Sequence, residues 1–320
     1  MMTDVFTSNR ALLFGIAYRM LGSVAEAEDV VQETFVRWQR QDPATIATPK
    51  AWLVATLTRL AIDQLRSARR RREEYVGVWL PEPLVDPTAP APDEVAALGD
   101  SLGMAFLFML ETLGPVERAV FLLREAFDYD YGEIAAIVGK AEATCRKMVS
   151  RAKNHFARRE RPDTAPSPQA EQIVQRFTNA CATGEVGDLL AVLTDDAVLY
   201  ADGGGRVRSV LRPIRNADRI SRFFAAVHRR FPASTPVVIT RVNGEIGTVM
   251  RRADGYLSIS AFAFDGDRIR AIYTVSNPEK LRHAFRPANA AIDGAVIERI
   301  PPGSAAWGMD IVPSSEPGKP

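Results

Sequence analysis

Basic and hydroxyl side chains share one face of the segment 142–159, whose apolar residues recur at helical spacing. The apolar positions are Cys145, Met148, Val149, Ala152 and Phe156. Lys147, Ser150, Arg151 and Asn154, which could contact DNA bases and phosphates, lie on the opposite face. A short amphipathic helix over 133–138 and a glycine turn precede this segment, which is typical of a helix-turn-helix with its second helix in the major groove. The alternative is an ordinary helical hairpin with a solvated basic face.

A second set of charged residues lies on the predicted helical segment 58–72. The exposed positions are Arg59, Asp63, Arg66, Arg69, Arg70, Arg71 and Arg72. A basic helix end beside aromatic residues could contact phosphates and bases that have left the stack. A basic end that only interacts with solvent is the alternative.

The segment 25–38 has the opposite character. It predicts a helix that buries Val30, Val31 and Phe35. The exposed face is acidic and contains Glu28, Asp29, Gln32 and Glu33. Such a face does not suit DNA and favours a basic protein partner. A solvated helix face is again the alternative.

Composition limits the function classes. The chain has 320 residues, of which 47% are hydrophobic and 25% charged, as in ordinary soluble proteins of two or three domains. The two cysteines and three histidines lack metal-ligand spacing, so we expect no metal, no cofactor and a reducing, cytoplasmic location. We find no signal peptide in the sequence, and no apolar run approaches the ~20 residues that a membrane span needs.

Proline-rich stretches divide the chain. Residues 1–75 predict helices, and Thr48-Pro49 opens the third of them. We expect a proline-rich linker over 76–100, a helical domain over 101–161, a short linker over 162–168, a further domain over 169–286 and a mostly disordered tail over 287–320. A short strand over 295–300 is a possibility within that tail.

The domain over 169–286 is predicted to be α+β. Helices are expected over 169–183, 186–193 and 216–230, and strands over 237–242, 245–252, 256–264 and 268–275. The strands are joined by Asn243-Gly244, Asp254-Gly255 and Asp265-Gly266, which are strong hairpin signals. The pattern predicts an antiparallel meander with helices on one face.

Several strings in the first half resemble the extracytoplasmic-function sigma factors of bacterial RNA polymerase. They are residues 28–35 (EDVVQETF), 49–53 (PKAWL), 63–66 (DQLR) and 113–118 (LGPVER), in the family's order. The resemblance covers about residues 5–160 and implies two all-α sigma domains, the second a helix-turn-helix.

The resemblance also implies partners. Asp29, Gln32 and Glu33 would dock on the clamp helices of the largest subunit of core RNA polymerase. The residues from Arg59 to Arg72 named above would recognise and help to melt the minus-ten element of promoter DNA. The minus-thirty-five element would be recognised by Thr144, Arg146, Lys147, Ser150 and Arg151. Cys145 departs from the valine that is common there, and we expect it to pack in the core.

Three further strings are similar to the subgroup with a fused SnoaL-like domain, a cone formed by a curved antiparallel sheet. The fused domain is understood to regulate the sigma domains in cis, in place of a separate anti-sigma protein. Arg206 and Glu279 replace the usual lysine and aspartate. We hypothesise that the first string packs against the other two; the strings are Trp79, Leu80, Pro81, Glu82, Pro83; Asp202, Gly203, Gly204, Gly205, Arg206, Val207; and Asn277, Pro278, Glu279, Lys280, Leu281.

Other functions stay open at this point. The C-terminal pocket could bind a small apolar ligand and shift a conformational equilibrium. An isomerase or cyclase would need a carboxylate base, for which Asp202 is the nearest candidate with Tyr200 and Tyr256 as donors, but no clear acid–base pair is present. For the whole chain, the alternative is a stand-alone helix-turn-helix regulator with a ligand-sensing domain, against which the acidic 28–33 face argues.

Overall fold

Three helices form the first helical unit. The computed structural model describes residues 2–42, 45–86, 103–159, 169–230, 237–252 and 254–284. Within it, α1 (Met2–Leu21), α2 (Val24–Gln39) and α3 (Pro49–Glu73) pack side by side. Ser23 caps α2 by accepting a hydrogen bond from the Glu26 amide, and Pro49 stands at the start of α3, as the sequence predicts.

The second helical unit contains α4 (Met104–Leu110), α5 (Pro115–Glu125), α6 (Tyr131–Val138) and α7 (Glu142–Arg159). Asp130 and Glu133 form a capping box at the start of α6. Gly139 ends α6 with φ 65°, a left-handed conformation that glycine adopts without strain. The helix-turn-helix prediction is confirmed, and Cys145 is fully buried against the neighbouring helices.

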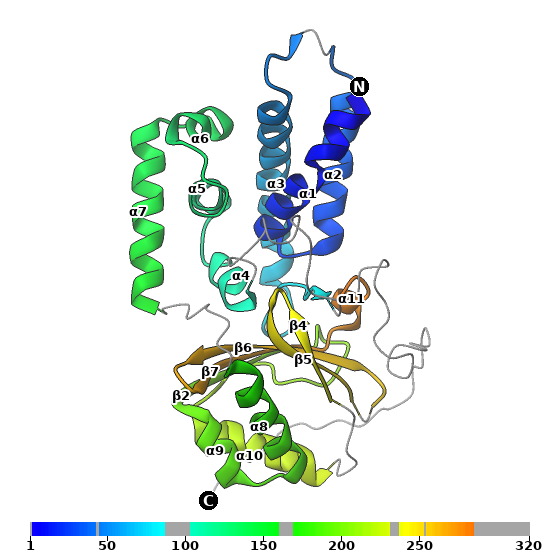
Figure 1. Cartoon of the computed structure of the whole chain (residues 1–320), viewed down its shortest axis with the longest axis vertical. Helices are drawn as coiled ribbons and strands as arrows, with labels where there is room; N and C mark the ends of the chain where they lie inside the picture. Colours follow the sequence, from blue (N-terminus) through cyan, green and yellow to red (C-terminus); the bar gives the residue numbers. More distant parts are fainter. Residues whose placement is uncertain are drawn as a thin grey trace, which may run out of the picture.

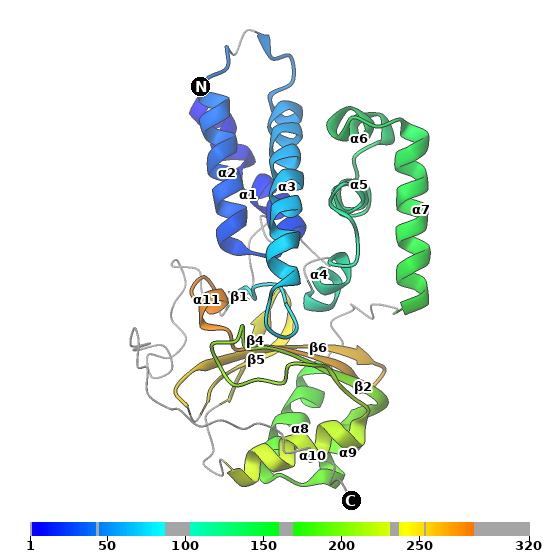
Figure 2. The same cartoon turned by 180° about the vertical axis from the view of Figure 1, so that it is seen from behind.

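The two helical units share one hydrophobic core. Buried residues of α1, α2 and α3 continue into those of α5, α6 and α7 without a break. Figures 1 and 2 show α3 facing α5 and α6 from opposite viewpoints. The two units are therefore packed together in this structure.

In the part of the chain that the structure describes, the C-terminal unit consists of a seven-stranded sheet and four helices. Its strands are β1 (Val85–Asp86), β2 (Leu193–Asp202), β3 (Ile214–Arg215), β4 (Val237–Val242), β5 (Glu245–Arg251), β6 (Leu257–Asp265) and β7 (Arg268–Val275). Its helices are α8 (Ala170–Thr183), α9 (Val186–Val192), α10 (Ala217–Arg230) and α11 (Pro278–Leu281). The order across the sheet is β1-β4-β5-β6-β7-β2-β3.

The sheet confirms the predicted meander and corrects the expected pairing. Strands β4 to β7 are antiparallel, joined at the predicted Asn-Gly and Asp-Gly turns. However, β2 runs parallel to β7, so the sheet is mixed and open at β1 and β3. The sequence did not predict β2, because Asp195 and Asp196 interrupt its apolar pattern where the pairing register shifts.

Both faces of the sheet are covered. Helices α8, α9 and α10 pack on one face through a core that includes Phe177, Leu199 and Phe262. The opposite face meets Leu80 of the linker and Met104 of α4. Figure 2 shows this arrangement, with α8–α10 below the sheet and the two helical units above it.

Two observations complete the fold. No helix within the described ranges is long and apolar enough to span a bilayer. The tail 287–320, with the predicted strand at 295–300, lies outside the described residues, as do 87–102 and 160–168 from the two predicted linkers.

Candidate functional site

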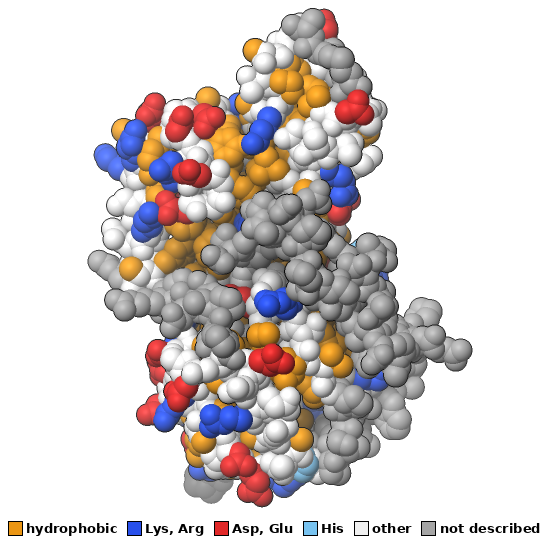
Figure 3. All heavy atoms as spheres, in the orientation of Figure 1, with side chains coloured by type: hydrophobic (Ala, Val, Ile, Leu, Met, Phe, Trp, Pro, Cys, Tyr) orange, Lys and Arg blue, Asp and Glu red, His pale blue; other side chains and the backbone are white. Residues whose placement is uncertain are grey.

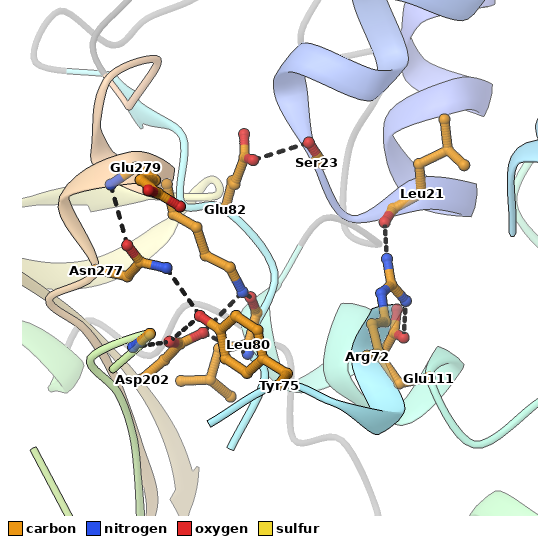
Figure 4. Close-up of polar contacts among 12 residues, drawn as sticks. Leu21, Ser23, Arg72, Tyr75, Leu80, Glu82, Glu111, Asp202, Asn277 and Glu279 are labelled. Carbon is orange, nitrogen blue, oxygen red and sulfur yellow. Dashed lines mark hydrogen bonds and ion pairs between the residues drawn. The ribbon is translucent and has the colours of Figure 1, made fainter. Parts of the chain in front are cut away.

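The segment from Tyr75 to Val85 contacts all three units, and we call the place where it lies the junction. Val85 pairs with Val242 as the first residue of β1, so the linker supplies an edge strand to the C-terminal sheet. Figure 4 shows the polar contacts that surround this segment. The sequence predicted an extended linker here, and its residues 80–83 are buried.

Strand pairing places Asp202 and Asn277 beside each other. Because β2 and β7 are parallel, their carboxyl ends meet at the same edge of the sheet, with Asp202 opposite Val275. The backbone oxygen of Asp202 accepts hydrogen bonds from the amides of Ser276 and Asn277 at 2.8 and 3.0 Å. Two of the predicted strings, 202–207 and 277–281, are therefore brought together.

Asp202 and Lys280 form a buried ion pair that holds the backbone of Leu80. Lys280 Nζ lies 2.7 Å from Asp202 Oδ2 and also donates to the Leu80 carbonyl. The Leu80 amide donates to the same Asp202 oxygen at 2.9 Å. Burial lowers the pKa of Lys280 to about 8, and the Asp202 carboxylate opposes that shift. The backbone amide and carbonyl of Leu80 are thus both hydrogen-bonded to the Asp202–Lys280 ion pair.

Tyr75 extends this network. Its hydroxyl donates to Asp202 Oδ1 at 2.5 Å and accepts from the side-chain amide Nδ2 of Asn277 at 2.8 Å. Burial, together with the Asp202 carboxylate, raises the pKa of Tyr75 well above its ordinary value. A Cβ on Gly204, which has φ 60°, would overlap the Asn277 side chain, so the glycine loop permits this close approach.

The two residues that depart from the subgroup's pattern contact each other. Arg206 lies 3.0 Å from Glu279, and both side chains are more than half exposed. The substituted pair keeps opposite charges and links the 202–207 loop to α11. Its exposure makes it a small contributor to stability.

Glu82 ties the linker to the first helical unit. Its carboxylate accepts from the Ser23 hydroxyl at 2.8 Å and the Val24 amide at 2.7 Å, at the start of α2. Its own amide donates to the Gly22 carbonyl at 2.8 Å. Burial raises the pKa of Glu82, while these donors oppose the shift.

The C-terminal sheet reaches the same place through Asn243. Tyr18 of α1 donates to the Glu82 carbonyl at 2.6 Å and accepts from the Asn243 amide at 2.7 Å. Asn243 also exchanges hydrogen bonds with the Leu84 backbone. The β4–β5 turn, predicted only as a hairpin connection, therefore binds both the linker and α1.

The second helical unit joins the junction through Glu111. This carboxylate forms ion pairs with Arg72 and with Arg118, the latter at 2.7 Å. Arg72 also lies 3.6 Å from the centroid of the Trp79 ring, and Lys280 lies 3.9 Å from it. Both arginines donate to carbonyls at the end of α1, Leu21 and Met20.

Helix α4 packs on the open face of the C-terminal sheet. The centroid of the Phe108 ring lies 4.9 Å from that of Tyr200 and 5.6 Å from that of Tyr273. Met104 and Ala105 belong to the same buried cluster. The face where a cone pocket was expected is thus in contact with the second helical unit.

The predicted DNA-binding residues fall into two groups. Thr144, Arg146, Lys147, Ser150 and Arg151 are exposed on α7. Asp63 and Arg66 are exposed on α3 and pair with each other at 2.9 Å. Arg59 instead donates to the carbonyls of Ala136 and Ile137 at the end of α6, and Arg72 is turned into the junction. The side chains of Arg69, Arg70 and Arg71 lie outside the described residues.

The predicted polymerase-binding residues are exposed on α2. Asp29, Gln32 and Glu33 face solvent, and Glu33 pairs with Arg37 at 2.7 Å. On the face shown in Figure 3, acidic and basic side chains are interspersed over the upper part of the molecule, with hydrophobic side chains between the two helical units. Within the described ranges, no group of three or more His, Cys, Asp or Glu could hold a metal ion.

Comparison with known proteins gives consistent matches along the chain. The family models "Sigma-70 region 2" and "Sigma-70, region 4" match residues 5–71 and 103–156. The ECF RNA polymerase sigma factor SigJ of Mycobacterium tuberculosis is 34% identical over 288 residues, covering 86% of this chain and 91% of SigJ. A probable ECF sigma factor from the same species, SigI, is 32% identical over 280 residues, covering 86% and 92%.

The likeness extends to three dimensions. The crystal structure of M. tuberculosis SigJ is 30% identical and superposes with a TM-score of 0.70, covering 87% of this chain and 97% of that one. Because these matches cover more than the two sigma-70 regions, they include the C-terminal unit.

Proposed function

This chain belongs to the extracytoplasmic-function sigma factors, and we propose that its SnoaL-like C-terminal unit regulates the two sigma units in cis. As a sigma factor it binds core RNA polymerase and promoter DNA to direct transcription initiation. The proposal concerns how that activity is controlled within one chain.

We assign the binding surfaces by residue. Asp29, Gln32 and Glu33 on α2 would dock on the clamp helices of the largest polymerase subunit, because an exposed acidic helix face suits a basic protein surface. The exposed 144–151 residues of α7 would contact the minus-thirty-five element. Arg59, Asp63, Arg66 and the following arginines would contact the minus-ten element.

The engagement of Arg59 supports a closed, inactive arrangement. Its guanidinium donates to Ile137 at 3.0 Å and Ala136 at 3.1 Å, where the end of α6 carries partial negative charge. A promoter phosphate or base would have to replace these carbonyls. Contact of Arg59 with DNA therefore requires that these hydrogen bonds to the second sigma unit are broken.

The observation that best supports cis regulation is that the C-terminal unit contacts both the linker after the first sigma unit and helix α4 of the second. Lys280 and Asp202 hold Leu80 of the linker, and the sheet packs against Phe108 of α4. Because the linker is also tied to α2 through Glu82, separation of the sigma units would break at least one of these contacts. The C-terminal unit therefore stabilises the closed arrangement over the open one.

This arrangement would provide control without a separate anti-sigma protein. A sigma factor acts on RNA polymerase, so we place the protein in the cytoplasm. The arrangement also argues against an isomerase-type activity. Asp202, the nearest candidate base, is paired with Lys280 and accepts from Tyr75, Leu80 and Gly204. A carboxylate occupied in this way is poorly suited to abstract a proton from a substrate.

The proposal is tested by replacing Trp79 with alanine in the full chain. Loss of the ring removes the surface on which Arg72 and Lys280 rest, so transcription from a target promoter with core polymerase should rise. Trp79→Phe keeps an aromatic face and should stay close to the wild type. Unchanged transcription by Trp79→Ala across several promoters would reject the proposal.

A further inference from the structure

A cavity of about 320 Å³ lies where the linker meets both sigma units. Its walls come from α3, the linker, and the segment from the end of α4 to the first turn of α5, including Leu65, Arg72, Trp79, Glu111 and Arg118. This volume is at the lower end of the range for small-molecule sites, ~300–1,000 Å³. The cavity differs in position from the face of the SnoaL-like sheet that contacts α4.

The cavity wall carries more positive than negative charge. Arg72 and Arg118 both pair with Glu111, so two guanidinium groups share one carboxylate. Their side chains are 16% and 3% exposed, so solvent compensates the remaining charge poorly. Glu26 also attracts Arg72, but it does not line the cavity. The other carboxylates of the junction are engaged, Asp202 by Lys280 and Glu82 by Ser23 and Val24.

Arg118 also has unused hydrogen-bonding capacity. One of its terminal nitrogens donates to Met20 and Glu111, while its buried Nε has no hydrogen-bond partner among the described residues. The Nε is closed to solvent, so the cavity itself offers the outer edges of the two guanidinium groups, which pair well with the oxygens of phosphate and carboxylate groups. Leu65, Leu113 and Pro115 also line the cavity and could contact a small apolar part of a ligand.

We propose that this cavity binds a small anion carrying a phosphate or carboxylate group, which strengthens the closed arrangement of the sigma units. The cavity is assembled from three segments of the chain that meet only when the two sigma units and the linker are packed together. A ligand that binds there shifts the equilibrium toward the closed state. The regulatory consequence rests on the proposed cis regulation, whereas the binding itself does not.

The test is calorimetric titration of the full chain with inorganic pyrophosphate and, at equal ionic strength, with succinate. Thr112 lines the cavity and is exposed, and its hydroxyl contacts the Met109 carbonyl and His155, so two variants that lose the same contacts must be compared. Thr112→Glu places a carboxylate where the ligand would bind, and Thr112→Gln is the neutral control of the same size.

We expect saturable binding of at least one probe at one site per chain in the wild type. Affinity should be lower by about tenfold or more in Thr112→Glu than in Thr112→Gln, because the two differ only in charge. The bound probe should also raise the thermal midpoint of the wild type, and should raise it less in Thr112→Glu than in Thr112→Gln. Absence of saturable binding of both probes to the wild type, or equal binding by the two variants, would overturn the proposal. Transcription is not the readout, so a failure of cis regulation would be recognised separately.

Discussion

Lys280 Nζ lies 2.7 Å from Asp202 Oδ2, and the two side chains are 8% and 0% exposed. The pair joins α11 to the end of β2 and holds the amide and carbonyl of Leu80 between them. The attachment of the linker to the SnoaL-like unit therefore depends on a charge pair shielded from water.

Replacing Lys280 with methionine should release the linker. Loss of one partner leaves a buried charge without compensation, which typically costs ~3–5 kcal/mol. Exchange of the Leu80 amide hydrogen should accelerate by roughly 100-fold or more. The Asp202→Asn/Lys280→Met double variant should recover part of this loss, because no isolated charge is left. Additive effects of the two substitutions within ~0.5 kcal/mol would contradict the coupling.

Gly22 offers a test of the contact with Trp79. Its φ is 66°, and a Cβ there would lie 2.8 Å from the Trp79 ring. Gly139 has φ 65° with no atom within 4 Å of such a Cβ, so it is a matched control for backbone strain. Both alanine variants should lose ~1–2 kcal/mol from strain.

Gly22→Ala should additionally displace Trp79 and raise transcription, whereas Gly139→Ala should lower stability without that rise. Denaturant unfolding and run-off transcription measure the two effects. Equal transcription by the two variants would show that the contact between Gly22 and Trp79 does not affect transcription.

Glu245 predicts a dependence of stability on pH. It follows the β4–β5 turn, and a Cβ on Gly103, at the start of α4, would overlap its carboxylate. Burial raises the pKa of Glu245 to about 7. Because the folded chain binds this proton more tightly than the unfolded chain, the contribution is present below the ordinary pKa and is lost as pH rises through about 7.

Glu245→Gln should therefore raise the thermal midpoint at pH 8 and change it little at pH 5. Paired melting curves of both proteins at the two pH values measure this. A variant that is equally or less stable at pH 8 would mean that the charged carboxylate is well accommodated.

The sequence predicted the parts of the fold that depend on local patterns. Strands β4 to β7 alternate with clear turn signals, and the α6–Gly139–α7 pair shows helical spacing with a glycine stop. Strand β2 was missed because Asp195 and Asp196 interrupt its apolar pattern and because its parallel pairing with the distant β7 leaves no turn signal.

The junction was predicted in part. Resemblance to a known subgroup brought together the strings containing Trp79, Asp202 and Lys280. Tyr75 and Asn243 carried no such signal, because their partners Asp202 and Tyr18 lie 127 and 225 residues away. Arg72 was grouped with its neighbouring arginines, and only its position opposite Glu111, 39 residues later, turns it inward.

Run-off transcription with core RNA polymerase tests the central claim most directly. A protease site inserted within residues 160–168 allows the SnoaL-like unit to be released from the purified full chain, and the uncleaved protein is the control. Cis regulation by a closed arrangement predicts that both forms initiate at the promoter and that cleavage increases the transcript. Equal output before and after complete cleavage and removal of the released unit would contradict it.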